Sequence, residues 1–346
     1  MKLFLKFCFL LFVSSNIFAQ KDIELYSSAM EKFNKNDFSY ALNIFEQIVN
    51  LDEVDKQLLA SSEFYIAECL LGMQQVDGAM SQYQSFIIEY PHSAFVDLAL
   101  YKLGSLYFNR KQYRLARNSL ISLINNYPSS KYIGSAYYLI GESFTEENNI
   151  DKAEKFFQTS IKKHNNSFAD YSLFSLAGIY EKKGDYENAV KYYDKLLGFY
   201  SKSKLAPQAQ LRIGNCYFKL GEYDNAVIEL SDPLIEKLPT KERNEADFIL
   251  ANCFYRLKEY GNASDTYKRI LNNSPTKEML DKIRYGLAWI HFHEGHYQNA
   301  YKLFNTLSKS VNDSIAIKSF YWSGEAQRYA GHNNEAIKIH KAFAKK

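Results

Sequence analysis

The sequence is poor in proline, in net charge and in long apolar runs, and each shortage narrows what the protein can be. Only 6 of its 346 residues are proline, which favours helices that follow one another through short turns. The formal net charge is +3, so the chain lacks the basic surface that a nucleic-acid backbone requires. No window offers the ~20 apolar residues that span a bilayer. We therefore expect neither nucleic-acid binding nor a transmembrane span.

Sequence motifs of common enzymes are also missing. The chain has no Gly-rich phosphate loop, no Gly-x-Ser-x-Gly and no His-Glu-x-x-His. One cluster could still bind a metal: His291, His293 and His296 lie beside Glu294, and three imidazoles could ligate zinc in a metal-dependent hydrolase. The repeat pattern described below places these histidines near the end of a helix, which favours ordinary packing. We expect a protein that is not an enzyme and needs no cofactor, with the metal site kept as the alternative.

The first 19 residues have the features of a secretory signal peptide. Lys2 and Lys6 form a basic start, residues 7–13 are apolar, and residues 17–19 read Ile-Phe-Ala. We therefore expect cleavage after Ala19, export to the periplasm or beyond, and a mature chain over residues 20–346.

An internal repeat covers the rest of the chain. Small residues recur with a period of 36–38 residues, and an alanine follows each of them after twelve residues, which gives nine units. We number each unit so that the small residue is position 8 and the alanine is position 20. The small residues are Ala29, Ala67, Gly104, Gly141, Ala177, Gly214, Ala251, Ala288 and Gly324. The alanines are Ala41, Ala79, Ala116, Ala153, Ala189, Ala226, Ala263, Ala300 and Ala336.

Within each unit the pattern predicts two helices joined by a tight turn. Position 7 is aliphatic in seven units, and position 11 is Leu, Tyr or Phe in the second to seventh units. Both share a helical face with position 8, as a buried stripe requires. Gly184, Gly221 and Gly295 stand at position 15, where the first helix must end and the chain must turn. Such a hairpin cannot bury both of its faces alone, so the units must stack. The cysteines Cys69, Cys216 and Cys253 all stand at position 10, where we expect small buried residues rather than disulfides.

This pattern resembles the tetratricopeptide repeat. The run Ile213-Gly214-x-x-Tyr217, followed by Gly221-x-Tyr223-x-x-Ala226, carries the resemblance. It implies an all-α, right-handed solenoid of about nine hairpins. Linkers such as Tyr90-Pro-His-Ser93 and Tyr127-Pro-Ser-Ser130 place a serine before the next helix. They look like linkers of bacterial envelope repeat proteins, namely the Tol–Pal-associated periplasmic coordinator and the lipoprotein of the outer-membrane β-barrel assembly machine.

The resemblance also implies a function. In that family the face formed by positions 5, 9 and 12 lines a concave groove that binds peptides, and here the same positions carry rings and amides. We therefore expect a non-catalytic periplasmic scaffold for a protein or peptide partner in envelope maintenance, or alternatively a dedicated subunit of outer-membrane protein assembly. The other interpretation of position 5 is packing against the next repeat. The predicted groove residues are Tyr101, Phe108, Tyr138, Phe174, Asn215, Phe218, Phe248, Asn252, Tyr255, Tyr285, Trp289 and Phe292.

Overall fold

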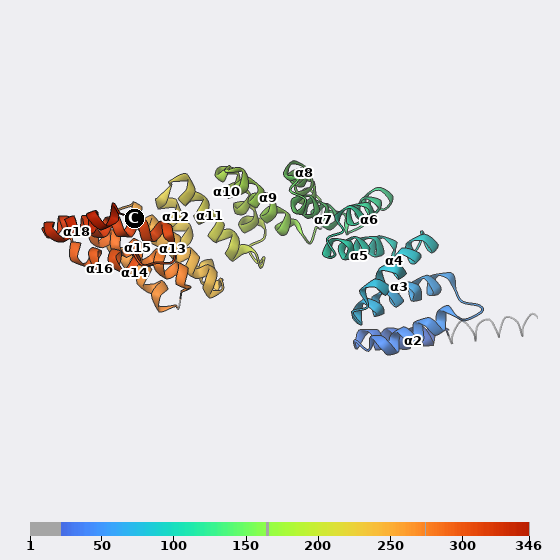
Figure 1. Ribbon diagram of the computed structural model, residues 1–346. Helices are drawn as coiled ribbons and strands as arrows, with labels where there is room; N and C mark the ends of the chain where they lie inside the picture. The colour runs from blue at the N-terminus through green and yellow to red at the C-terminus, as the bar shows by residue number, and fades with distance from the viewer. Residues whose placement is uncertain (1–21, 164–165, 274, 346) are drawn as a thin grey trace, which may run out of the picture. The chain divides into compact units, whose positions relative to one another are not determined.

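The computed structural model describes residues 22–163, 166–273 and 275–345, and among them it contains helices and no strand (Figure 1). The predicted signal peptide, residues 1–19, lies outside the described residues. The helices pair into nine consecutive hairpins, so the predicted all-α fold of repeated hairpins is confirmed. Contacts group them into two compact units that divide between Ser172 and Leu173. No helix among the described residues is long and apolar enough to cross a membrane.

The first unit begins with a helix over residues 22–34, which forms the first hairpin with α2. Each later helix contacts the helix that follows it up to α8, as sequence-adjacent hairpins require. The remaining helices of this unit are α2 (Phe38–Val49), α3 (Lys56–Gly72), α4 (Val76–Glu89), α5 (Val96–Asn109), α6 (Tyr113–Asn126), α7 (Ile133–Glu146) and α8 (Ile150–Ile161). The next helix, α9 (Ala169–Lys183), contains the division between the units.

The second unit continues the same order. Its first helices also contact one another from hairpin to hairpin, α11 with α13, α13 with α15 and α15 with α17, and so form a continuous face. The helices are α10 (Tyr186–Phe199), α11 (Ala206–Leu220), α12 (Tyr223–Leu230), the short 3-10 helix η1 (Pro233–Lys237), α13 (Thr240–Arg256), α14 (Tyr260–Asn272), α15 (Lys277–His293), α16 (Tyr297–Leu307), α17 (Asp313–Tyr329) and α18 (Asn333–Phe343).

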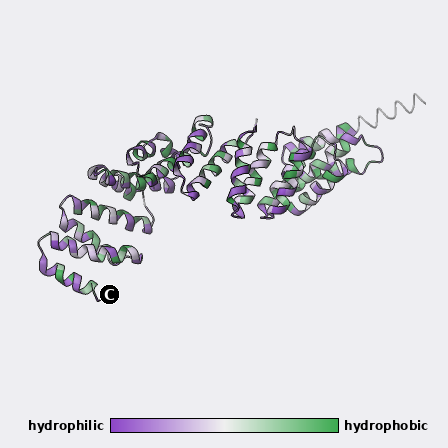
Figure 2. Cartoon of the chain, turned by 90° about the horizontal axis from the view of Figure 1, so that it is seen from above, coloured by the Kyte–Doolittle hydropathy of each residue, from purple (hydrophilic) through white to green (hydrophobic). Residues whose placement is uncertain are grey.

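Small residues at positions 8 and 20 allow the two helices of each hairpin to approach closely. All nine alanines at position 20 are at most 2% exposed. Position 8 faces position 24 of the same hairpin: a Cβ added to Gly214 would lie 2.5 Å from Leu230 Cγ, and one added to Gly141 would lie 2.7 Å from the Phe157 ring. The large side chain at position 24 therefore fills the space that the missing Cβ leaves. Hydrophobic and hydrophilic residues alternate along the helices accordingly (Figure 2).

The turn inside every hairpin uses one backbone conformation. All nine residues at position 15 have a left-handed φ between 59° and 81°. Four of them are glycines, namely Gly184, Gly221, Gly295 and Gly331, and the other five carry side chains. Glycine adopts this conformation without steric cost, which explains its recurrence. The non-glycine residues are Asn36, Gln74, Lys111, Asn148 and Lys258.

The linkers between hairpins are organised by side-chain hydrogen bonds. The Oγ atoms of Ser130 and Ser203 each accept a hydrogen bond from the backbone N–H two residues later, at 3.1 Å. In both linkers the helix begins one residue after that N–H, at Ile133 and Ala206. The serine thus folds the turn that precedes the helix, as the linker sequence predicts. The three cysteines at position 10 are free and fully buried.

Candidate binding site

The twelve predicted groove residues all lie on first helices of hairpins, and all twelve side chains are partly buried. Tyr101 and Phe108 lie on α5, Tyr138 on α7, Phe174 on α9, Asn215 and Phe218 on α11, Phe248, Asn252 and Tyr255 on α13, and Tyr285, Trp289 and Phe292 on α15. Partial burial fits both interpretations of the stripe, a binding surface and a packing surface. The contacts of each ring distinguish the two.

In the first unit, the position-5 rings of the second, third and fourth hairpins stack on the next hairpin, whereas Tyr26 of the first hairpin contacts Phe45 and Tyr65 edge to face. Each stacking partner is the aromatic residue immediately before or near the start of the next first helix, and the two planes are within 16° of parallel. These rings connect successive hairpins and have one face covered. The pairs, with the distance between ring centroids, are Phe64–Phe95 at 4.7 Å, Tyr101–Tyr132 at 5.2 Å and Tyr138–Phe168 at 5.1 Å.

The rings at position 12 pack within their own hairpins. Each contacts the aromatic residue at position 17, where the second helix begins, so it braces the turn between the two helices. The pairs are Phe33–Phe38, Phe108–Tyr113, Phe218–Tyr223, Tyr255–Tyr260 and Phe292–Tyr297, with centroids 5.4–5.8 Å apart. A structural role therefore accounts for Phe108, Phe218 and Phe292.

Five of the predicted residues come together around one pocket in the second unit. The pocket has a volume of about 540 Å³, a size in the range of small-ligand sites. It lies on the face made by α13, α15 and the start of α17. The five are Phe248, Asn252, Tyr255, Tyr285 and Trp289; the other lining residues are Arg256, Tyr267, Lys282, Gly286, Asn312, Ser314 and Ile315.

Aromatic packing fixes the walls of this pocket. Trp289 contacts Tyr285 at 6.3 Å between centroids and Trp322 at 4.4 Å. Asn252 is held from two sides: its Nδ2 donates to the Phe248 carbonyl at 2.6 Å, and its Oδ1 accepts from the Tyr267 hydroxyl at 3.2 Å. The pocket wall is therefore formed before any ligand arrives, which lowers the entropy cost of binding.

The pocket carries positive charge without a compensating acid in its lining. Arg256 and Lys282 line it, and no carboxylate is among the described residues that do so. Lys282 also forms a solvent-exposed ion pair with Glu278 at 2.7 Å, and Glu278 is not among the lining residues. Burial raises the pKa of the Tyr255 hydroxyl, so this ring stays neutral at physiological pH. Aromatic walls beside two cations suit a ligand whose apolar side chain is flanked by negatively charged groups.

The predicted stripe of positions 5, 9 and 12 did not include these two cations. Lys282 stands at position 2, three residues before position 5, and Arg256 stands at position 13, four residues after position 9. Residues three or four apart share a helix face, so the face of the stripe also carries positions 2 and 13. Asn312, Ser314 and Ile315 come from the linker and the first turn of α17, and only the stacking of three hairpins brings them to the pocket.

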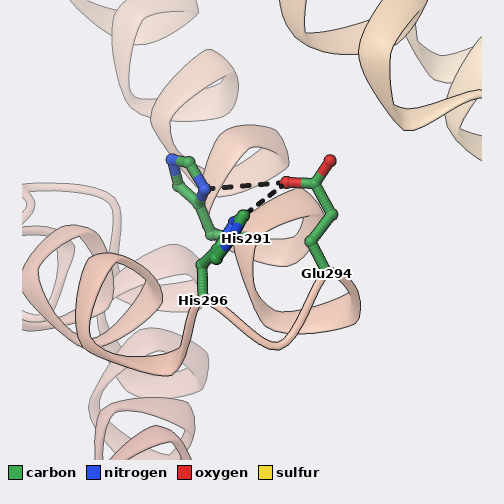
Figure 3. A group of neighbouring side chains, drawn as sticks. All are labelled: His291, Glu294 and His296. Atoms are coloured by element: carbon green, nitrogen blue, oxygen red, sulfur yellow. Dashed lines mark ion pairs between the residues drawn. The ribbon is translucent and has the colours of Figure 1, made fainter.

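Of the three histidines in the predicted metal site, two lie together and the third lies apart. The side chains of His291 and His296 converge on Glu294, and their ligand atoms all lie within 4.8 Å of one another (Figure 3). His293 points elsewhere: its ring stacks on Tyr260 at 5.7 Å with planes 1° apart, and on Trp289 at 5.7 Å. The three-histidine set is therefore not assembled, whereas a set of two histidines and one glutamate is.

Comparison with protein families gives repeated matches to one family. One model described as "Tetratricopeptide repeat" matches residues 61–93, 98–130, 135–167, 208–232 and 245–276, and a second with the same description matches residues 172–198. Together these segments make up more than half of the chain. Comparison with curated proteins gives no match.

Solved structures of other proteins align along most of the chain. The apo form of RapI is 15% identical, covers 94% of this chain and 98% of its own, and has a TM-score of 0.54. The C-terminal part of a repeat protein from Cytophaga hutchinsonii is 11% identical, covering 91% and 98%, with a TM-score of 0.49. A tetratricopeptide repeat protein from Parabacteroides merdae is 14% identical, covering 76% and 98%, with a TM-score of 0.47. At such low identity the likeness to RapI concerns the fold alone.

Proposed function

Because the chain belongs to the tetratricopeptide-repeat family, we propose that it is a non-catalytic interaction scaffold of the bacterial cell envelope. It holds an extended peptide segment of a partner protein in the pocket between α13, α15 and α17. The observation that carries the proposal is the convergence of Phe248, Tyr255 and Tyr285 around one preformed pocket. Rings of this kind give large contact area at low entropy cost, which is why they dominate peptide and protein interfaces.

The partner segment is acidic with an apolar anchor. Aromatic walls take an aliphatic or aromatic side chain, while Arg256 and Lys282 attract carboxylates on either side of it. A basic segment would meet two like charges and no acid in the pocket lining. All residues that line the pocket belong to the second unit. In the first unit, Tyr101 and Tyr138 are already stacked on neighbouring hairpins.

The envelope location rests on residues 1–19 and on the Tyr-Pro-x-Ser linkers. A cleaved signal peptide would deliver the mature chain to the periplasm, where its partner would belong to envelope maintenance. The finer possibilities are coordination of a Tol–Pal-like system and service as a subunit of outer-membrane protein assembly. Mass spectrometry of the chain purified from the envelope fraction should find Gln20 at the N-terminus. Intact Met1 there would contradict the export proposal.

Binding can be tested with labelled peptides of defined composition. Fluorescence anisotropy would compare twelve-residue peptides that carry a central Phe or Leu flanked by Asp and Glu with matched peptides that carry Asn and Gln instead. We expect the acidic series to bind more tightly. Tyr285→Ala should weaken binding about fivefold or more, because truncating a central aromatic residue costs over ~1 kcal/mol.

Phe199→Ala is the matched control. That ring lies at the end of α10, is 78% exposed and does not line the pocket, so its loss should leave affinity unchanged. Arg256→Gln should weaken the acidic peptides and leave the neutral ones unaffected. Equal effects of Tyr285→Ala and Phe199→Ala would place the binding surface outside this pocket.

A further inference from the structure

The turn between α15 and α16 brings together three side chains that the binding pocket does not use. The Nδ1 atom of His291 lies 3.9 Å from Glu294 Oε2, and the Nδ1 atom of His296 lies 3.4 Å from the same oxygen. Figure 3 shows both rings directed at this one carboxylate oxygen. The two imidazole centroids are 5.9 Å apart. Two nitrogens and one oxygen therefore face a common point.

The backbone of the repeat determines this arrangement. Gly295 has a φ of +78°, and the N–H of His296 donates to the carbonyl of His291 at 2.8 Å, which closes the turn. His291, Glu294 and His296 occupy positions 11, 14 and 16 of the unit. Because every hairpin has the same left-handed turn, positions 11 and 16 are neighbours throughout the chain.

Position 11 is Leu, Tyr or Phe in the second to seventh units, and it is polar only in the two terminal hairpins and in the eighth. In the ninth hairpin, positions 11 and 16 are Gln327 and His332, joined by a hydrogen bond of 2.8 Å between Oε1 and Nδ1. In the first hairpin they are Lys32 and Asp37, whose charged groups lie 4.0 Å apart. Both pairs combine a donor with an acceptor. Only the eighth unit has histidine, glutamate and histidine at positions 11, 14 and 16.

This cluster lacks the hydrogen bond that its chemistry would otherwise require. His291 Nδ1 is buried and has no hydrogen-bond partner among the described residues. A buried polar atom without a partner is rare in native proteins and calls for a specific reason. A cation placed among the three groups would satisfy both ring nitrogens and the carboxylate at once.

We propose that His291, Glu294 and His296 form a site for a borderline divalent cation, with zinc as the best fit. Two imidazole nitrogens and one carboxylate oxygen suit zinc better than magnesium or calcium, which take oxygen ligands. Zinc ligands at ~2.1 Å in a tetrahedron lie about 3.4 Å apart. The His296–Glu294 distance already matches this value, and the His291–Glu294 distance must shorten by about half an ångström. The ligand atoms of the two histidines, which lie within 4.8 Å of each other, must also come to this spacing.

The surroundings permit that small movement. The side chains of Glu294 and His296 are 34% and 59% exposed, so they can turn without disturbing the core. With three protein ligands, the fourth position goes to water, as in other open zinc sites. Lys268 is the cation that faces His291 from α14, and it pairs with Asp265 at 3.1 Å, which reduces its repulsion of the metal. The bound ion ties the end of α15 to the start of α16.

Isothermal titration of the untagged mature chain with zinc chloride tests the site. We expect one zinc ion per chain. His296→Ala and Glu294→Gln should each lower the association constant at least about tenfold, because losing even a group that only hydrogen-bonds to a metal ligand costs about 10–100-fold in affinity. Zinc should also raise the melting midpoint of the wild type more than that of His296→Ala at the same zinc concentration, because a ligand that binds only the folded state stabilises it in proportion to its affinity.

His293→Ala is the matched control, because this residue lies in the same turn but stacks on Tyr260 instead. It should bind zinc within about twofold of the wild type. His296 is mostly exposed, so its substitution tests the site even if His291→Ala disturbs folding. Absence of saturable zinc binding would overturn the proposal. So would a loss in His293→Ala as large as that in His296→Ala, because the ion would then be bound elsewhere.

Discussion

Replacing Gly214 by alanine should destabilise the protein although the change lies in the middle of a helix. Gly214 stands at position 8 of the sixth hairpin, on α11, and packs against Leu230 at the end of α12. A Cβ at this site would lie 2.5, 2.6 and 3.3 Å from three carbon atoms of the Leu230 side chain. Leu230 is itself 3% exposed, so its side chain has little room to move away.

Two opposing effects set the magnitude. Alanine is favoured over glycine inside a helix by about 1 kcal/mol. Inserting an atom into a packed interface costs about 1–3 kcal/mol. With a contact as short as 2.5 Å to Cγ rather than to a flexible chain end, the packing cost should be the larger one. We therefore expect a net loss of about 1 kcal/mol, which corresponds to a lower melting midpoint by about 2–4 °C for a unit of this size.

The assay is thermal unfolding followed by far-ultraviolet circular dichroism, with Gly261→Ala as the matched control. Gly261 lies in α14 of the same unit, and a Cβ there meets no atom within 4 Å. The same substitution should therefore stabilise the protein at Gly261 and destabilise it at Gly214. If both variants gained stability equally, the close approach of position 8 to position 24 would be refuted.

Three further predictions concern the turns, the thiols and one partly buried acid. Gly221→Ala should lower the melting midpoint and Lys258→Gly should raise it, because both residues have a left-handed φ that costs a residue with a side chain ~1–2 kcal/mol. Midpoint shifts of the same sign and size in the two variants would contradict a shared left-handed turn. Thiol labelling at pH 8 should modify Cys69, Cys216 and Cys253 only after unfolding. Burial raises the pKa of the Cys69 and Cys253 thiols to about 12 and also raises that of the Cys216 thiol, so little reactive thiolate is present. Peptide mapping that finds Cys216 labelled in the native protein would refute this prediction. Burial raises the pKa of the Glu181 carboxyl, so the folded protein binds its proton more tightly than the unfolded chain does. Protonated Glu181 therefore contributes stability below the ordinary pKa of glutamate, and this contribution is lost as the pH rises through the raised pKa of the folded state. Urea midpoints of Glu181→Gln relative to the wild type should therefore rise with pH across that window, and a constant difference would show that Glu181 does not titrate there.

The sequence alone determined the hairpins. The spacing of Gly214 and Ala226 predicts two closely packed helices, and the structure buries every residue at positions 8 and 20. Gly221 marks the turn between them. These features are readable because each depends on residues within one repeat, and nine copies of the same pattern reinforce one another. The left-handed turn at Lys258 could not be read from that residue type, because the hairpin imposes the conformation there against the preference of the side chain.

The tertiary structure decided what the aromatic stripe and the histidines do. Tyr101 and Tyr285 occupy the same position of their repeats, yet Tyr101 stacks on the next hairpin whereas Tyr285 lines the pocket. The difference depends on the linker residue that reaches each ring from the following hairpin, about 30 residues away. His293 likewise lies between His291 and His296 in the sequence but outside their cluster, because a helix directs neighbouring side chains to different faces. The repeat spacing along the chain specifies where the helices and turns lie, whereas the pocket and the proposed cation site depend on which side chains the stacked hairpins and the turn bring into contact.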